Sequence, residues 1–397
     1  MDKKWVSISD VLFFQEGPGV RNTQYTTEGV KLLNVSNLVD GKLDLSTSDR
    51  YISEEEAYGK YKHFLCDDGD FIVASSGIKV EYIDKKMGFV DKENLPLCMN
   101  TSTIRFKVLD KEKLNIRYFM YYVKSQSYKN QVAFHITGSA QLNYGPTHLK
   151  KMVMPLIDIE EQQKIVTILD KVTEIVKARQ QELQKLDDLI KARFVEMFGT
   201  LDSPTQEFRK ATLKELCNKI TDGKHGGCKS ETGTERYFVG AREIYDDEVH
   251  YDTAAEINTE EFEKDYKRCN LEIGDFLIVN TGATIGKSAI ASDERTEHTL
   301  LQKSVALLKV KQEVLNPIFL KWCYRVNKQM YMVESASAQP NLLLSKINAT
   351  VIYVPSIELQ NQFADFVKQV DKSKLNVQKA LDETQLLFDS LMQKYFG

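Results

Sequence analysis

The sequence predicts an α+β fold, in which two tandem mixed α/β domains are joined by two long helices that form an antiparallel coiled coil with a pseudo-two-fold axis. Three observations predict this fold. Short sequence landmarks recur in the same order in the two halves of the 397-residue chain. Each half ends in a long segment without internal proline or glycine, which is typical of a long helix. Those two segments also share an apolar seam with coiled-coil spacing.

The recurring landmarks indicate a tandem duplication. They are a Gly-Asp-Phe motif, a Ser-Ala-Gln loop that ends in Asn, and a long segment that begins with Pro and ends in Phe-Gly. In pairs, these are 69–73 and 274–278, 139–143 and 337–341, and 155–199 and 355–397. Aligned on their prolines, the long segments also share Gln162 with Gln362, and both then reach an Asp-Lys pair, Asp170-Lys171 and Asp371-Lys372. A duplicated unit predicts two similar binding sites at a fixed separation.

The chain divides into four segments. In order they are a first domain at 1–154, a central helix at 155–200, a second domain at 201–354 and a C-terminal helix at 355–397. Both domains show the same plan of two strand-like runs followed by a helical pattern. The expected strands are 71–74 and 103–108, then 275–279 and 304–310, and the expected helices are 114–126 and 318–329.

Seam residues of the two long segments alternate at spacings of four and three, as in a coiled coil. The first seam is Val172, Val176, Arg179, Leu183, Leu186, Ile190, Arg193 and Met197. Subtracting 198 gives the second seam the same register: Val370, Lys374, Val377, Leu381, Thr384, Phe388, Leu391 and Tyr395. Each helix could instead cover only its own domain, but the matching register and length favour a helix pair.

Connectivity sets the direction of the pair. The first helix leaves the first domain and enters the second, so a second helix that returns to the first domain must run antiparallel. The seam from Val172 to Met197 rises roughly 38 Å. This length is on the order of one turn of B-DNA, the usual separation of half-sites in dimeric DNA readers. The geometry therefore suggests two DNA readers at a fixed spacing.

Composition places the chain among ordinary globular proteins, with 42% hydrophobic and 28% charged residues. A net charge of −4 argues against wholesale nucleic-acid binding, although a local basic face could still read DNA. The six cysteines form no CxxC pair, which indicates free thiols in a reducing cytoplasm. No apolar run approaches the roughly 18 residues of a membrane span, so we expect no membrane association.

The whole chain resembles the specificity subunit of Type I restriction–modification enzymes. The resemblance rests on the Ser-Ala-Gln-x-Asn loop, the apolar stretch that leads to a Pro, and the Gln-containing helix start, all of which occur twice. It implies two target-recognition domains that read the halves of a bipartite double-stranded DNA target, with helices that set the spacer and dock other subunits. It also implies a non-catalytic chain that directs two modification (methyltransferase) subunits and the restriction (translocase–nuclease) subunits in DNA methylation and restriction.

The sequence shows no motif that predicts catalysis, a cofactor or a metal. The 282–288 segment, GATIGKS, resembles a phosphate-binding loop, but three residues separate its glycines where four are needed. We interpret it as a strand-ending turn that presents Lys287 to a DNA phosphate. His225 and Cys228 lack a second pair of metal ligands. Two alternatives stay open: a scaffold that spaces protein partners without reading DNA, and an enzyme with an unrecognised active site.

Polar loop residues are the candidates for DNA contact, because Gln and Asn can read adenine and Arg or Lys can read guanine. The repeated loop supplies four candidates that we expect to hold the loop or touch the DNA backbone: Gln141, Asn143, Gln339 and Asn341. Polar residues particular to one half suit base reading: Arg21, Asn22, Lys79 and Arg105, then Lys224, His225, Asn280 and Lys303. The adjacent Lys150 and Lys151 suit phosphate contact.

Overall fold

The computed structural model describes residues 3–136, 143–331 and 341–397. The chain divides into two compact units: unit 1 comprises Met1–Arg179 with Ala380–Gly397, and unit 2 comprises Gln180–Lys379. The long helices α6 (Ile159–Phe198) and α11 (Ile357–Phe396) each contribute one part to each unit. Within the described ranges, none of the helices has the length and apolar character needed to cross a membrane.

Unit 1 is built on a four-stranded antiparallel sheet with the order β2-β10-β7-β8. In chain order these strands are β2 (Leu12–Glu16), β7 (Phe71–Ala74), β8 (Met87–Phe89) and β10 (Thr103–Val108). One face of the sheet packs on α3 (Ile116–Lys124), α4 (Gln126–His135) and the long helices. The other face packs on a small sheet of β6 (Tyr51–Ile52), β3 (Val30–Leu33) and β9 (Leu97–Met99). Two-stranded pairs complete the unit: β1 (Lys4–Ser7) with β11 (Val153–Leu156), and β4 (Leu38–Val39) with β5 (Lys42–Leu43).

Unit 2 repeats every sheet of unit 1 in the same order. Its main sheet is β13 (Cys217–Asp222), β21 (Val305–Val310), β18 (Phe276–Val279) and β19 (Ser288–Ile290). Its small sheet is β17 (Ala255–Glu256), β14 (Tyr237–Val239) and β20 (Thr299–Leu301). The two-stranded pairs are β12 (Arg209–Thr212) with β22 (Val351–Val354) and β15 (Ile244–Tyr245) with β16 (Glu248–Val249). The helices are α7 (Leu213–Leu216), α8 (Thr259–Asp265), α9 (Pro317–Val326) and α10 (Leu344–Ala349).

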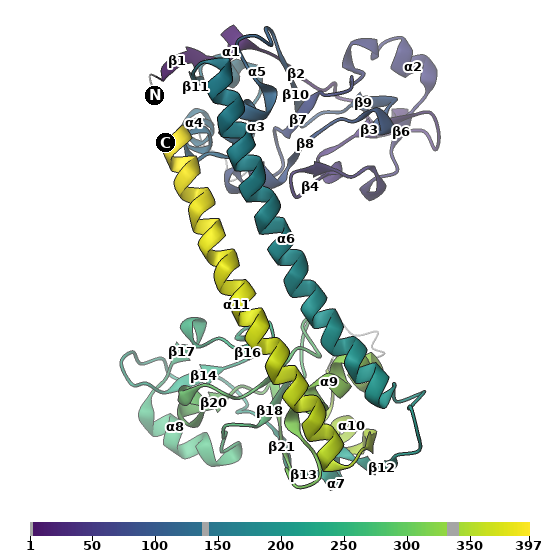
Figure 1. The fold of residues 1–397 in the computed structure, drawn as a ribbon, viewed down its shortest axis with the longest axis vertical. Coiled ribbons are helices and arrows are strands. Elements are labelled where there is room, and N and C mark those ends of the chain that lie inside the picture. Colours follow the sequence, from purple (N-terminus) through teal and green to yellow (C-terminus); the bar gives the residue numbers. More distant parts are fainter. Residues whose placement is uncertain (1–2, 137–142, 332–340) are drawn as a thin grey trace. The chain divides into compact units, whose positions relative to one another are not determined.

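The long helices pack side by side and antiparallel within each unit, which confirms the predicted coiled coil (Figure 1). In unit 1 the start of α6 and the end of α11 pack on α3, where the rings of Tyr118 and Phe396 lie 5.0 Å apart. In unit 2 the end of α6 and the start of α11 pack on α9, where the rings of Phe198 and Phe319 lie 4.9 Å apart.

Burial follows the predicted seam of the helix pair. Every predicted seam residue is buried or half-buried, and the residues that separate them are mostly exposed. The apolar members are Val172, Val176, Leu183, Leu186, Ile190 and Met197 on α6, and Val370, Val377, Leu381, Phe388, Leu391 and Tyr395 on α11. In unit 2 the two helices are also joined by an ion pair, in which Lys374 Nζ lies 2.8 Å from the Asp187 carboxylate.

The structure corrects the alignment of the long segments on their prolines. Both helices have 40 residues, and their first residues, 159 and 357, differ by 198. In this register Gln162 corresponds to Gln360. Both glutamines are fully buried. Each side-chain amide donates to two backbone carbonyls, at 2.8 and 2.7 Å in unit 1 and at 3.0 and 2.9 Å in unit 2. Gln362 is exposed, so its match to Gln162, like that of the Asp-Lys pairs, is coincidental.

The repeated Gly-Asp-Phe motif turns the chain into an equivalent strand of each main sheet. Gly69 and Gly274 adopt φ values of 84° and 95°, which glycine tolerates without strain. The aspartate that follows is buried and bonds a lysine of the neighbouring strand, Lys107 in unit 1 at 3.2 Å and Lys309 in unit 2 at 2.7 Å. Removal from water raises the pKa of Asp275, and the bond to Lys309 opposes that rise.

Candidate nucleic-acid interface

Three strands of the main sheet of unit 1 meet at one edge. At this edge β2 and β7 end and β10 begins. The loops that leave it are 17–29, 75–86 and 100–102. We call these loops the loop edge of unit 1. The end of the repeated Ser-Ala-Gln loop joins them, because Asn143 forms a β-bridge with Ser76.

Unit 2 forms the same arrangement from β13, β18 and β21. Its loop edge consists of the loops 223–236, 280–287 and 302–304. The repeated loop again ends there, through a bridge between Asn341 and Thr281. The two units therefore present loops on equivalent frames.

A glycine in each unit allows the backbone of the loop edge to pack closely. The Gly17 amide donates to the first residue of β10 at 2.9 Å, and the Gly223 amide donates to the first residue of β21 at 3.2 Å. A Cβ at Gly17 would lie 2.0 Å from the Asn100 carbonyl, and one at Gly223 would lie 2.1 Å from the Leu301 carbonyl. Any larger residue would push the first loop away from the sheet.

In unit 1 the loop edge is organised by Asn100, which is 2% exposed. Its side-chain oxygen accepts from the amides of Val20 at 3.2 Å and Thr101 at 2.8 Å. This fixes the backbone immediately before Arg21 and Asn22, and both of these residues are exposed. The first loop of this edge therefore presents the Arg21 cation and the Asn22 amide on a fixed backbone.

In unit 2 Lys224 holds the loop edge to α8. Its ammonium lies 2.7 Å from Asp265 and 3.4 Å from Glu261. The bond to Asp265 raises the pKa of Lys224. The pKa of the Glu261 carboxyl is lowered mainly by the hydrogen bond from the Lys229 amide, and Lys224 lowers it further. These ion pairs leave the lysine side chain 18% exposed, so it supports the loop instead of reaching out from it.

A second ion pair fixes the end of β13. The carboxylate of Asp222, which is nearly buried, bonds the Arg268 guanidinium and lies 3.3 Å from His225 Nε2. Arg268 also donates to the backbone carbonyls of Asp222 and Gly223 at 2.9 Å each. Sequence reasoning missed this pair and Asn100, because Asp222 and Arg268 are 46 residues apart and no motif joins them.

The structure places most predicted DNA-contact residues at the loop edges. These are Arg21, Asn22, Lys79 and Asn143 in unit 1, and His225, Lys287, Lys303 and Asn341 in unit 2, all of them exposed. Lys150 and Lys151 are exposed on the turn between α5 (Pro146–Leu149) and β11, outside the loop edge. Gln141 and Gln339 lie outside the described residues.

Three residues that were predicted to read bases are buried or held by ion pairs, which corrects the prediction for them. Arg105 is 7% exposed within β10, and its guanidinium donates to two backbone carbonyls and to Gln15, each at 2.7 Å. Asn280 is 4% exposed, and its backbone amide donates to Ser304 at 3.0 Å. Lys224 is held by its ion pairs. Arg105 and Asn280 are thus buried, and Lys224 is only 18% exposed.

The GATIGKS segment is the turn between β18 and β19. The amides of residues 285–287 donate to backbone carbonyls within 279–284 at 3.0 to 3.4 Å. A phosphate-binding loop needs such amides free to point at the phosphate. The interpretation as a turn is confirmed, and Lys287 is exposed on it.

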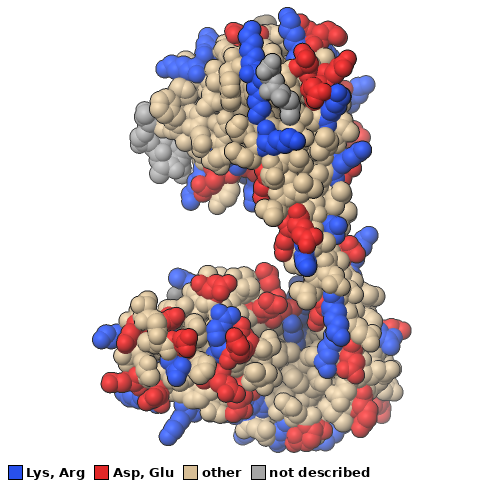
Figure 2. Space-filling view, turned by 60° about the vertical axis from the view of Figure 1, so that its left-hand side comes forward, with Lys and Arg blue, Asp and Glu red and all other residues tan. Residues whose placement is uncertain are grey.

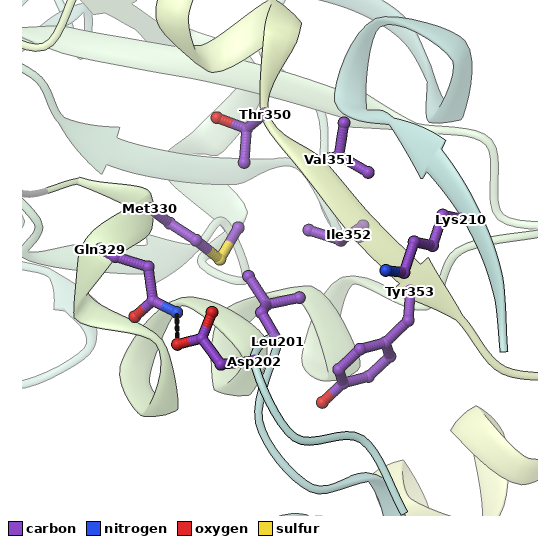
Figure 3. Close-up of a pocket in the computed structure, with 9 residues that line it drawn as sticks. All are labelled: Leu201, Asp202, Lys210, Gln329, Met330, Thr350, Val351, Ile352 and Tyr353. Carbon is purple, nitrogen blue, oxygen red and sulfur yellow. Dashed lines mark hydrogen bonds between the residues drawn. The ribbon is translucent and has the colours of Figure 1, made fainter. Parts of the chain in front are cut away.

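Two cavities in unit 2 are alternative candidate sites. One, of about 320 Å³, lies beside β22, and there the Asp202 carboxylate accepts from the Gln329 amide at 3.1 Å (Figure 3). The other, of about 390 Å³, borders the loop edge at Lys287, and its Asp247 carboxylate bonds Arg325 at 2.9 Å. The Asp202 and Asp247 carboxylates are therefore each engaged by a neighbouring side chain.

On the face drawn in Figure 2, acidic and basic side chains are interspersed over each unit. A mixed surface limits the uniform attraction of phosphates. Each loop edge carries its own set of exposed polar side chains.

The chain matches one protein family over both units. The family is described as "Type I restriction modification DNA specificity domain", and the matches cover residues 4–187 and 205–384. The chain belongs to this family. Each matched DNA specificity domain contains one complete loop edge.

Relatives of known name and structure agree with this family. The Type I restriction enzyme MjaVIII specificity subunit of Methanocaldococcus jannaschii is 22% identical over 190 residues, which is 47% of this chain and 43% of the relative. The match thus spans less than half of that relative. The Type I restriction–modification S subunit from M. genitalium aligns with a TM-score of 0.54 at 17% identity, over 100% of this chain and 97% of that one. A chain solved in work on complex assembly and conformational transition of the type I R-M system aligns with a TM-score of 0.58 at 16% identity, over 99% and 97%. At these identities the solved structures show that the fold is shared.

Proposed function

We propose that the chain is the targeting subunit of a Type I restriction–modification complex, and that each unit reads one half of a bipartite target in double-stranded DNA. One observation carries the proposal: the two loop edges share a backbone frame but present different side chains. Unit 1 offers Arg21 and Asn22, whereas unit 2 offers His225 and Lys303. Different donors and acceptors on equivalent frames suit two different half-sites.

The long helices would set the spacer and dock the other subunits. Each helix is continuous over 40 residues and contributes to both units, so the length of the pair bears on the spacing of the two readers. The partners would be two modification (methyltransferase) subunits and the restriction (translocase–nuclease) subunits. We keep the functional division into recognition domains at 1–154 and 201–354 and helices at 155–200 and 355–397, and we place the complex in the cytoplasm, where its DNA is found.

Methyl transfer with and without the modification subunits tests this function. The purified chain should transfer no methyl groups to DNA, and methylation of one bipartite sequence should begin when modification subunits are added. Duplex binding by the assembled complex should weaken with salt, since cations that contact phosphates release counterions. Methylation by the chain alone, or methylation without sequence preference in the complex, would show that the chain is not the targeting subunit.

A further inference from the structure

Two exposed polar side chains leave neighbouring backbone positions at the loop edge of unit 2. Lys224 and Gln302 form a parallel β-bridge, so the residues that follow them, His225 and Lys303, are also neighbours. The Lys303 amide donates to the Lys224 carbonyl at 2.9 Å, which ties the two segments together. Bridged backbones lie about 4.8 Å apart. The two side chains can therefore reach one base pair.

The backbone beneath this pair is fixed. Lys224 is bound to Asp265 and Glu261, and the turn at Lys303 is closed by a hydrogen bond from the Val305 amide to the Gln302 carbonyl at 2.9 Å. Within the described ranges, no ion pair holds the Lys303 ammonium. A free donor on a rigid turn is suited to discriminating contacts, because little ordering is needed on binding.

His225 has a defined orientation and a defined hydrogen-bonding role. Its side chain is 55% exposed, and Nε2 lies 3.3 Å from the Asp222 carboxylate. A carboxylate accepts hydrogen bonds, so Nε2 carries the proton of the neutral ring and Nδ1 remains an acceptor. The loop edge thus sets a donor, Lys303, beside an acceptor, His225.

Unit 1 lacks this pair at the equivalent positions. Gly17 and Gly223 donate equivalent hydrogen bonds, so they align the loop 17–29 with the loop 223–236. These bonds are accepted by the first residues of β10 and β21, which align the turn 100–102 with the turn 302–304. In this alignment Gly19 corresponds to His225 and Thr101 corresponds to Lys303. The pair is therefore particular to unit 2.

We propose that Lys303 and His225 together read one G·C base pair in the half-site of unit 2. In the major groove this pair presents the guanine acceptors N7 and O6 and the cytosine amino donor. The Lys303 ammonium would donate to guanine, and His225 Nδ1 would accept from the cytosine amino group. With the Lys303 ammonium at guanine O6 and His225 Nδ1 at the cytosine amino group, an A·T pair in the same register would place the adenine amino donor opposite Lys303 and the thymine carbonyl acceptor opposite His225. The proposal rests on the proposed function and adds residue roles to it.

The test uses the full chain assembled with its modification subunits and maps methylated sites by sequencing. The variants Lys303→Ala and His225→Ala should each relax the same single position of one half-site, with discrimination against the wrong base falling roughly tenfold or more. The other half-site should stay unchanged. Lys214→Ala is the matched control, because Lys214 is an exposed lysine on α7, next to the opposite end of β13.

Several outcomes would overturn the proposal. These are an unchanged target in both variants, relaxation at two different positions, or a change in the half-site of unit 1. A uniform loss of methylation at all sequences would also overturn it, since it would mark a phosphate contact. A different result would contradict the proposed function: the chain without substitutions, assembled with its modification subunits, would direct no sequence-specific methylation.

Discussion

Unit 1 and unit 2 have the same sheets, but different parts of the chain complete their cores. In unit 2 the aromatic ring that packs on α9 comes from Phe198, in the middle of the chain. In unit 1 the equivalent ring comes from Phe396, next to the last residue, and packs on Tyr118 of α3. The duplication thus produced two equivalent units in which the helices exchange their ends. Neither half of the sequence contains all of its own unit.

The largest test of this comparison removes the equivalent rings. Phe396→Ala should destabilise unit 1, and Phe198→Ala should destabilise unit 2, each by about 3–5 kcal/mol, because both side chains are fully buried. Hydrogen exchange measured along the chain would locate each effect. Faster exchange in unit 2 than in unit 1 after Phe396→Ala would contradict the assignment of the chain end to unit 1.

A smaller effect is expected from the separated halves. Residues 1–199 lack the end of α11 and expose their seam, so we expect them to form a homodimer in which a second copy supplies residues 182–198. With modification subunits this dimer should direct methylation to a palindrome of the first half-site. Arg193 and Leu391 are equivalent in the 198-residue register. The 1–199 dimer therefore has Arg193 where unit 1 has Leu391. A dimer of residues 200–397 would instead have Leu391 where unit 2 has Arg193.

The comparison therefore predicts unequal dimers. The 200–397 dimer should have the lower dissociation constant. Arg193→Leu should lower the dissociation constant of the 1–199 dimer by roughly tenfold, because the charged arginine guanidinium stays out of an apolar seam whereas leucine packs in it. Analytical ultracentrifugation over a concentration series measures both. A stable 1–199 monomer at micromolar concentration, or methylation of the original asymmetric site by its dimer, would contradict the exchange of helix ends.

Helix length gives a further test. Four residues inserted after Lys185, with four more after Lys374, should lengthen both helices by about 6 Å and turn one end by roughly 40° relative to the other. The second insertion belongs near Lys374 because its ion pair with Asp187 shows which parts of the helices face each other. Methylation mapping should show a changed spacer and unchanged half-sites. Altered half-site bases with the original spacer would rule out a spacing role for the helices.

The smallest effect concerns this ion pair, which unit 1 lacks. The register places Val176 and Gln385 where unit 2 has Lys374 and Asp187. Asp187→Lys should lower the stability of unit 2 by about 1 kcal/mol or less, because both side chains are about a third exposed. The exchange Asp187→Lys with Lys374→Asp should restore it in denaturant unfolding. If the double variant is no more stable than Asp187→Lys alone, the pair does not join the helices in solution.

Sequence reasoning was most accurate where the pattern is local. The strands at 71–74 and 103–108 are predicted with their observed bounds, and the 4–3 spacing identifies the seam, because both depend on neighbouring residues. Alignment on Pro155 and Pro355 misplaces the buried glutamine by two residues. The 198-residue register of the seam matches Gln162 to Gln360, and equivalent contacts from the residues before α3 and α9 confirm that match.

The candidate site was partly predictable. Exposed loop residues such as Arg21 and Lys303 follow from turn-rich sequence between strands. Arg105 carried a usable warning, because it lies in the middle of a predicted strand whose neighbours are apolar. The roles of Lys224 and Asp222 depend on ion pairs with residues 37 to 46 positions away, which no local pattern encodes.

The central claim is that two equivalent units read two different half-sites, and sequencing of genomic methylation tests it most directly. A host that carries the modification subunits would be compared with and without this chain. The account predicts that the chain adds one methylated motif, made of two short and different specified blocks separated by a gap of fixed length. A continuous motif, two identical blocks, or methylation that does not depend on the chain would contradict it.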